Sequence, residues 1–461
     1  MLRSELFSAA LGASAFALTF HTESDILRLM FPLVAFVATV RVQQSANMLW
    51  SWLLGTGAML GCYFWLADVG PTYFGIGQSW GVVILLMFAG FEGSIFVFAH
   101  ALSRALKSVL PVSSLAISWF VVQLAFPHII PWGWANLFLS YKPIVLSVGT
   151  LGTPMFSLLL FLAAGPVFTR TSHAAKISAL SLTLLLLATV LQLTKVRERA
   201  ATATAIRIGV VQNNLDPATD FRPEKRFENI TRQRLLSETL LHENPDLLVW
   251  PESAVHFDYP ESLRQIPLSS PGHPFPDLSF PILFGTQTLL SEANETGVPR
   301  YHLSGLMVGS GGVVLGRYDK RRLLPFAETM PMSSLFPALK KVLPSGYELV
   351  PGTGARTILL PPPHHGAVSV SICYEDLFSS AFEPIMNPSV LITLSNDVWF
   401  QNTAASRQHH LLSRLRAVEQ GKYFVRVSTS GVTAVVAPTG DEVFRLPLFK
   451  AAAGVTEVPL L

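Results

Sequence analysis

The stretch Asp246-Leu-Leu-Val-Trp-Pro-Glu252-Ser decides the fold of the C-terminal half of this 461-residue chain. Its short apolar run is typical of a buried β-strand, and the polar residue that follows such a strand can point into a cleft. Cys373 ends a second run of this kind, and Lys320 closes a similar but weaker run, Val313 to Tyr318. The pattern therefore predicts strands whose ends carry an acid, a thiol and an ammonium group.

These three groups suit covalent catalysis. A free cysteine has a pKa of about 8.5, and a neighbouring carboxylate can take its proton as the sulfur attacks. Glu252 is the expected base for Cys373. Lys320 is expected to stabilise the oxyanion that develops when a carbonyl is attacked, an effect often worth about 3 kcal/mol.

The chain from Ala205 onward alternates between strand-like and helical runs. A polar helical stretch runs from Glu224 to His242. The expected strands are Ile206 to Val211, Asp246 to Trp250, Pro281 to Gln287, Tyr301 to Gly309, Val313 to Tyr318, Gly366 to Cys373, Val390 to Leu394, Tyr423 to Val427 and Val432 to Ala437. This part is long enough for one domain of two packed sheets with helices outside.

The chain before Lys195 is far more apolar than the rest. Only 14% of all residues are charged and 50% are hydrophobic, whereas a soluble domain has about 25% charged residues; the mean hydropathy is +0.43. Apolar stretches predict seven membrane-spanning helices: Leu6 to Phe20, Ile26 to Val40, Met48 to Leu66, Trp80 to His100, Val109 to Phe126, Thr153 to Phe168 and Ile177 to Leu193. The composition changes near residues 195 to 205, which indicates a domain boundary.

The basic residues between these stretches predict an orientation. Those that fall on one side of the membrane, if the helices alternate, are Arg3, Arg41, Arg104, Lys107, Arg170 and Lys176. The positive-inside rule makes that side cytoplasmic, so the chain leaves the seventh span on the outer side. Residues 1 to 20 also fit a cleaved signal peptide, which stays open as an alternative.

Four segments resemble the nitrilase superfamily and, within it, the membrane-embedded apolipoprotein N-acyltransferase family. They are Trp250-Pro-Glu252-Ser, Lys320 with Leu324-Pro-Phe-Ala-Glu328, Ile372-Cys373-Tyr-Glu-Asp and Leu394-Ser-Asn396-Asp-Val-Trp-Phe400. The resemblance implies a multi-helix transmembrane bundle in residues 1–200, followed by a periplasmic αββα sandwich in residues 201–461. It also implies a multi-pass protein of the bacterial inner membrane.

The resemblance further implies an activity and a set of site residues. Cys373 takes the sn-1 acyl chain of a phospholipid, with phosphatidylethanolamine as the expected donor, and passes it to the α-amino group of a diacylated apolipoprotein. Glu252 and Lys320 complete the catalytic set. Glu328, Tyr374 and Glu375 are expected to support it by orienting the lysine. We expect a monomer without cofactor or metal, and the net charge of +3 argues against a nucleic-acid partner.

The chain departs from the family pattern at several positions near these motifs. The changed residues are Phe221, His302, Arg322, Ala327 and Gln401. An eighth span, expected from the family, does not follow before Leu461. These differences leave the substrate preference and the rate open.

Two other classes of function fit the same residues. A membrane-tethered nitrilase-type amidase would use the same three residues with water as the acceptor, and a related acyltransferase would use another amine. The last interpretation is a binder of lipid or lipoprotein without catalytic activity, although a binder has no need of the three reactive groups together. The sequence does not show the acceptor, which distinguishes the first two.

The expected helix from Ala404 to Gln420 contains adjacent histidines, His409 and His410. Adjacent side chains on a helix point in different directions, so a metal site there would need further ligands on one face. The spacing favours a structural role for this helix.

Overall fold

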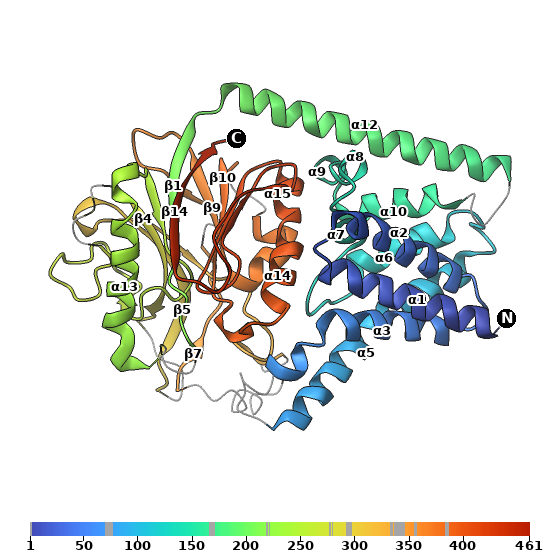
Figure 1. The fold of residues 1–461 in the computed structure, drawn as a ribbon, viewed down its shortest axis with the longest axis horizontal. Coiled ribbons are helices and arrows are strands. Elements are labelled where there is room, and N and C mark those ends of the chain that lie inside the picture. Colours follow the sequence, from blue (N-terminus) through green and yellow to red (C-terminus); the bar gives the residue numbers. More distant parts are fainter. Residues whose placement is uncertain are drawn as a thin grey trace. The chain divides into compact units, whose positions relative to one another are not determined.

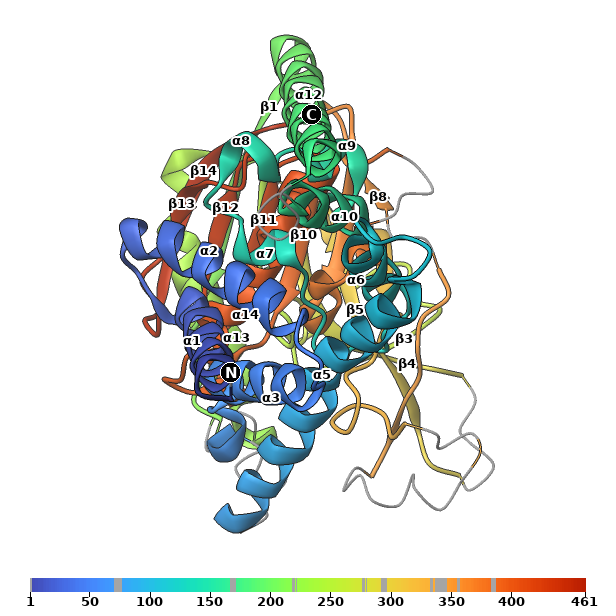
Figure 2. The same cartoon turned by 90° about the vertical axis from the view of Figure 1, so that its right-hand side faces the viewer.

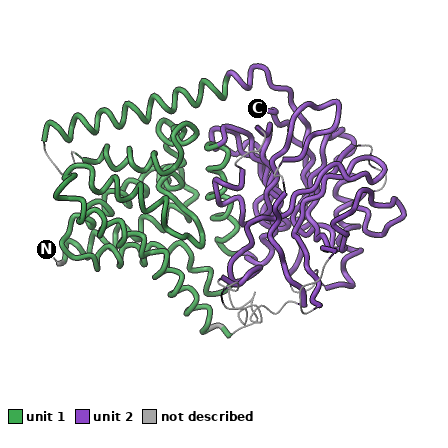
Figure 3. The backbone as a smooth tube through the Cα atoms, turned by 180° about the vertical axis from the view of Figure 1, so that it is seen from behind, with its two compact units in different colours: residues 1–197, 403–419 green, residues 198–402, 420–461 purple. Residues whose placement is uncertain are grey.

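The structure is a computed structural model that describes residues 2–69, 77–165, 171–217, 220, 222–275, 278, 280–291, 297–331, 335, 346–354, 357–382 and 387–461. The chain forms two compact units (Figure 3). One comprises residues 1–197 with 403–419, and the other comprises residues 198–402 with 420–461. Residues 403–419 thus group with the first unit although they lie far along the chain.

The first unit is helical. Its helices are α1 (Leu2–His21), α2 (Asp25–Val42), α3 (Leu49–Tyr63), α5 (Gln78–Leu106), α6 (Ser114–Ala125), α7 (Trp134–Leu137), α8 (Lys142–Val145), α9 (Val148–Leu151), α10 (Thr153–Ala163), α12 (Ser172–Thr202), α14 (Ala405–Ser413) and α15 (Leu415–Gln420). α1 packs against both α2 and α3, and α3 packs against α5 (Figures 1 and 2). α3 and α5 approach closely at Gly55, because glycine has no side chain there. A Cβ on Gly55 would overlap the backbone carbonyl of Gly93 on α5.

Each of the seven predicted spans overlaps a helix, but their lengths differ from the prediction. Among the described residues, only α5 and α12 are long and apolar enough to cross a membrane, with mean hydropathies of 2.3 and 2.0. α6 and α10 have 12 and 11 residues, and a straight span needs about 20. The predicted end at Phe168 lies outside the described residues. The seven-span bundle therefore stays a prediction.

Hydrogen bonds hold α14 to the other helices of the first unit. The Trp65 indole donates to Oε1 of Gln408 at 2.7 Å, and Nε2 of Gln408 donates to the carbonyl of Cys62 at 2.5 Å. Nδ2 of Asn136 donates to the carbonyl of Leu412 at 3.1 Å. His410 is buried, and the described part of the chain contains no group of three or more His, Cys, Asp or Glu that could hold a metal ion. These contacts give the helix a packing role.

The second unit is built on two sheets. The first has the order β14 (Ala452–Pro459), β1 (Ala205–Gln212), β2 (Leu247–Val249), β4 (Ile282–Leu289), β5 (Arg300–Val308) and β6 (Val314–Asp319), with β3 (Asp258–Pro260) beside β4 and β7 (Glu348–Leu349) beside β5. The second has the order β13 (Glu442–Arg445), β12 (Ala434–Val436), β11 (Phe424–Ser428), β10 (Val390–Ser395), β9 (Ala367–Ile372) and β8 (Thr357–Leu359). All nine predicted strands are present, whereas β3, β7, β8, β13 and β14 were not predicted.

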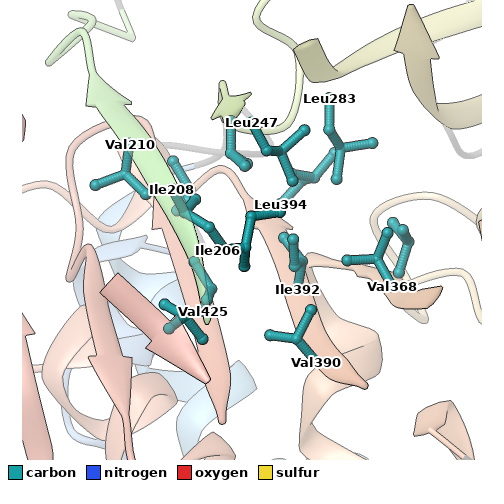
Figure 4. Packing of buried hydrophobic residues seen from close by; sticks show 14 of the residues in the cluster. Ile206, Ile208, Val210, Leu247, Leu283, Val368, Val390, Ile392, Leu394 and Val425 are labelled. Carbon is teal, nitrogen blue, oxygen red and sulfur yellow. The ribbon is translucent and has the colours of Figure 1, made fainter. Parts of the chain in front are cut away.

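The two sheets pack face to face. Alternate residues of β1, Ile206, Ile208 and Val210, lie in one buried cluster with Ile392 and Leu394 of β10 (Figure 4). This alternation follows from the period of two in a strand, because every second side chain points to the same face. The sheets therefore share a core, as expected for a sandwich.

A helix covers the other face of the first sheet. Ile230 of α13 (Arg226–Glu238) lies in a second buried cluster with Val211, Leu248 and Trp250. The first sheet is thus buried on both faces, which explains why β2 has no polar residue. Its next polar side chain is Glu252, immediately beyond the strand.

Candidate active site

Glu252 lies just beyond β2, on a tight turn against β4. The indole of Trp250 donates to the hydroxyl of Ser237 at 2.9 Å and fixes the start of the turn. A Cβ on Gly285 of β4 would lie 2.5 Å from the Cα of Glu252. Only glycine allows this approach, so β4 sets the position of the carboxylate backbone.

Lys320 follows β6 and is completely buried. Its Nζ donates to Oε1 of Glu328 at 2.6 Å and to Oε1 of Glu252 at 3.4 Å. The other oxygen of Glu328 accepts from the backbone N–H of Leu324 at 2.8 Å. The loop after Lys320 thereby folds back and places a second carboxylate on the ammonium group.

Cys373 immediately follows β9 and begins the 3₁₀ turn Cys373–Leu377. Its φ of 51° lies in the left-handed region, which a residue with a side chain rarely adopts and which is found at active sites. The thiol is half-buried, and it is close enough to the carboxylate of Glu252 for each group to shift the pKa of the other. The structure therefore brings the predicted acid, ammonium and thiol together from three different strand ends.

Burial and charge shift the pKa values of this cluster. Burial raises the pKa of Glu252 to about 7, although Lys320 opposes the shift. Burial disfavours the charge on Lys320, but the carboxylates of Glu328 and Glu252 outweigh it and raise the pKa of the ammonium group. Burial, and then the charge of Glu252, raise the pKa of the Cys373 thiol. A thiol that needs a base thus lies beside a carboxylate that titrates near neutral pH and a lysine that stays protonated.

Glu375 contacts the backbone after the lysine. It accepts hydrogen bonds from the hydroxyl of Tyr318 at 2.8 Å, from the N–H groups of Arg321 and Arg322 at 2.8 and 3.0 Å, and from Ile372 at 2.9 Å. Burial raises the pKa of this carboxyl. Glu375 therefore ties the Cys373 turn to the segment that follows Lys320.

Tyr374 is buried, and its ring lies edge-on to that of Phe378, with 5.0 Å between the centroids. The aromatic pair packs within the loop that carries Cys373. The supporting role of Tyr374 therefore stays a prediction.

An ion cluster that the sequence reading missed lies beside the Cys373 turn. Arg426 of β11 is completely buried and donates to Asp376 at 2.5 Å and to Asp397 at 2.8 Å. A charged residue between the buried Val425 and Val427 was the signal that could have revealed it, because a charge inside a central strand requires a partner. The cluster joins the Cys373 turn to the turn after β10.

The departures from the family pattern have different surroundings. His302 lies on β5, and its Nδ1 is 2.7 Å from the carbonyl oxygen of Val350. Ala327 is half-buried in the loop that carries Glu328, and Gln401 has a φ of 46° and a ψ of −151°, a region that favours glycine. Phe221 lies outside the described residues.

Residues 283–460, which include Lys320 and Cys373, match the carbon-nitrogen hydrolase family. Glu252 precedes the matched residues. The C-terminal half thus has a nitrilase-like fold, and the predicted resemblance to the nitrilase superfamily is confirmed.

Relatives make the resemblance more specific. The chain is 30% identical to apolipoprotein N-acyltransferase 2 of Treponema pallidum, over 56% of this chain and 52% of that protein. It is 27% identical to the apolipoprotein N-acyltransferase of Methylococcus capsulatus, over 87% of this chain and 82% of that protein. The chain thus spans about half the length of the first relative and most of the second.

Among solved structures, the chain is similar to Nit3 of Saccharomyces cerevisiae, a member of branch 10 of the nitrilase superfamily. The identity is 19%, the match covers 55% of this chain and 90% of that chain, and the TM-score is 0.39.

Proposed function

We propose that this chain transfers the sn-1 acyl chain of a membrane phospholipid to the α-amino group of the N-terminal S-diacylglyceryl cysteine of apolipoproteins. The observation that carries the proposal is the cluster in which the buried Lys320 ammonium group donates to Glu252 and Glu328. Cys373 lies beside the Glu252 carboxylate, whose pKa is raised to about 7. The similarity to apolipoprotein N-acyltransferases over 87% of the chain, including the helical unit, supports the substrate class.

In the first step Glu252 takes the proton of Cys373 while the sulfur attacks the ester carbonyl. The tetrahedral oxyanion lies near the protonated Lys320 and the backbone N–H of Tyr374, both hydrogen-bond donors. Collapse of this intermediate forms the thioester. Protonated Glu252 returns its proton to the leaving glycerol oxygen, and lysophospholipid departs.

In the second step the amine of the lipoprotein attacks the thioester. Glu252 takes a proton from the nitrogen, Lys320 again faces the oxyanion, and the thiol is released with its proton restored. Glu328 holds Lys320 in place, because it accepts the shorter of the two carboxylate hydrogen bonds. Both half-reactions therefore use the same three side chains.

The apolar helices explain why a chain with this chemistry would be anchored in a membrane. A diacyl lipid leaves the bilayer reluctantly, at about 0.8 kcal/mol per buried CH₂, so the reacting thiol has to work beside the membrane. We place residues 1–200 in the bacterial inner membrane as a multi-pass bundle and residues 201–461 on the periplasmic side, in a monomer. The length and apolar composition of α5 and α12 support the membrane assignment of the first 200 residues.

The proposal is tested by mass spectrometry of the purified chain after incubation with phosphatidylethanolamine and no acceptor. We expect a fatty-acyl adduct on Cys373 that is absent from Cys373→Ala. Addition of a diacylated lipopeptide should discharge the adduct with formation of an N-acyl product, whereas discharge to free fatty acid alone would indicate an amidase-like hydrolase. Absence of any adduct while lipid stays bound would contradict the proposal and favour a binder.

A further inference from the structure

A cavity of about 210 Å³ lies in the second unit beside the segment that follows Lys320. Its lining consists of Arg321, Arg322, Glu375, Phe378, Ser380 and Ala381. Two arginines, one serine and one phenylalanine therefore line a single cavity together with Glu375, whose carboxylate accepts hydrogen bonds from Tyr318 and from backbone N–H groups. Such a lining is typical of a site for an anion.

The two arginines of this cavity contact Glu375 through their backbone. Arg321 and Arg322 donate only their backbone N–H groups to Glu375. The carboxylate of Glu375 also accepts hydrogen bonds from the hydroxyl of Tyr318 and from the backbone N–H of Ile372. Within the described part of the chain, no ion pair joins either guanidinium to a carboxylate.

One of the two guanidinium groups is held in a defined plane. The Cζ of Arg322 lies 3.7 Å from the centroid of the Phe378 ring, which places the guanidinium over the aromatic face. A stacked guanidinium keeps its N–H edge free and ordered, and that edge matches the two oxygens of a phosphate. Stacking therefore reduces the loss of side-chain entropy when the arginine binds a phosphate.

The cavity is also close along the chain to the reacting groups. Arg321 directly follows Lys320, and Glu375 comes two residues after Cys373. In a phospholipid, only the glycerol backbone separates the sn-1 ester from the phosphate. A ligand whose ester reaches Cys373 thus carries its phosphate only a glycerol backbone away from the thiol.

We propose that the cavity binds the phosphate group of the phospholipid acyl donor. The guanidinium groups of Arg321 and Arg322 supply charged donors, and the hydroxyl of Ser380 supplies a neutral one. This inference rests on the proposed function, because it assigns a headgroup subsite to the acyl donor of that reaction. Specificity is directed at the phosphodiester and not at the substituent beyond it.

The test measures equilibrium binding to the full chain carrying Cys373→Ala, in neutral detergent. Two ligands with the same acyl chains are compared: dioleoylphosphatidylglycerol, which has a phosphodiester, and dioleoylglycerol, which has none. We expect Arg321→Gln combined with Arg322→Gln to weaken binding of the phospholipid at least tenfold and to leave dioleoylglycerol unchanged. Arg445→Gln is the matched control, because Arg445 is an arginine of β13 outside the cavity and should change neither ligand.

Equal loss for both lipids, or no loss for either, would overturn the proposal. Inorganic phosphate as a competitor distinguishes the two sources of the anion. If phosphate binding depends on the arginine pair but phospholipid binding does not, the site takes free phosphate and the lipid assignment is wrong.

A separate arm keeps the proposed function distinguishable from the subsite. The chain with Cys373 intact is incubated with phosphatidylethanolamine or with p-nitrophenyl palmitate, which lacks phosphate, and the acyl-enzyme is followed by mass. The double arginine variant should acylate slowly from the phospholipid and normally from the activated ester. If the unaltered chain forms no acyl-enzyme with either donor, the proposed function fails, while the binding comparison still decides the phosphate subsite.

Discussion

Replacement of Arg426 by methionine should destabilise the second unit more than any substitution at its surface. Arg426 is completely buried, and its two terminal nitrogens donate to Asp376 at 2.5 Å and to Asp397 at 2.8 Å. Methionine has a similar length and no charge. The variant therefore leaves two buried carboxylates without their shared cation.

The expected magnitude follows from the cost of an unpaired buried charge. Removal of one partner of a buried ion pair costs about 3–5 kcal/mol, and here one substitution deprives two carboxylates, so we expect the upper end of that range. For a unit of this size the loss corresponds to a fall in melting temperature of roughly 10–20 °C.

The assay is thermal unfolding of the full chain in detergent, followed by near-ultraviolet circular dichroism. Arg445→Met is the matched control, because Arg445 forms an exposed pair with Glu442 at 3.1 Å and such pairs contribute at most about 1 kcal/mol. Addition of Asp376→Asn and Asp397→Asn to Arg426→Met should recover part of the loss. If Arg426→Met and Arg445→Met unfold at the same temperature, the reasoning on the buried cluster is refuted.

Three further predictions concern the site and its flanking turns. Because Glu252 has to be ionised to accept a proton and its pKa is raised to about 7, acyl-enzyme formation should rise with pH through neutrality and be roughly tenfold faster at pH 8 than at pH 6; a flat profile would contradict this role. Gly285→Ala places a Cβ 2.5 Å from the Cα of Glu252, so the acylation rate should fall about hundredfold. Gly354→Ala is the control, because open space surrounds Gly354, and it should retain the rate; equal rates for the two variants would disprove the packing argument. Gln401→Gly relieves a backbone with φ 46° and ψ −151° and should stabilise the chain by about 1 kcal/mol in the same thermal assay; an unchanged or lower melting temperature would mean that the turn is not strained.

The sequence predicts the strands that carry the cluster because they are continuous apolar runs. β2 and β9 are buried along their whole length, so composition alone indicates them. β14 was missed because its small residues, from Ala452 to Gly454, give no strand signal, and its pairing with β1 becomes visible only in the folded chain. Strand stability there comes from a partner distant in sequence, which a local pattern does not contain.

The site was predictable in part for a related reason. The positions at strand ends and the family motifs predict Glu252, Lys320 and Cys373 as site residues, and the structure brings these residues together. The cluster around Arg426 consists of side chains from three separate segments. The spacing of residues within one segment cannot predict that these side chains come together. Tyr318 was missed for the same reason, since its role as a donor to Glu375 appears only when β6 lies beside the Cys373 turn.

The membership of residues 403–419 in the helical unit has a consequence for protein engineering. The polypeptide leaves the second unit after Asn402 and returns to it at Gln420, so a single cut near residue 200 cannot separate the two units. Expression of the C-terminal half alone would deprive Gln408 and Leu412 of Trp65, Cys62 and Asn136. The buried side of α14 would then lose its packing partners and face water. A water-soluble catalytic fragment would therefore require a designed loop in place of residues 403–419, in addition to removal of the N-terminal helices.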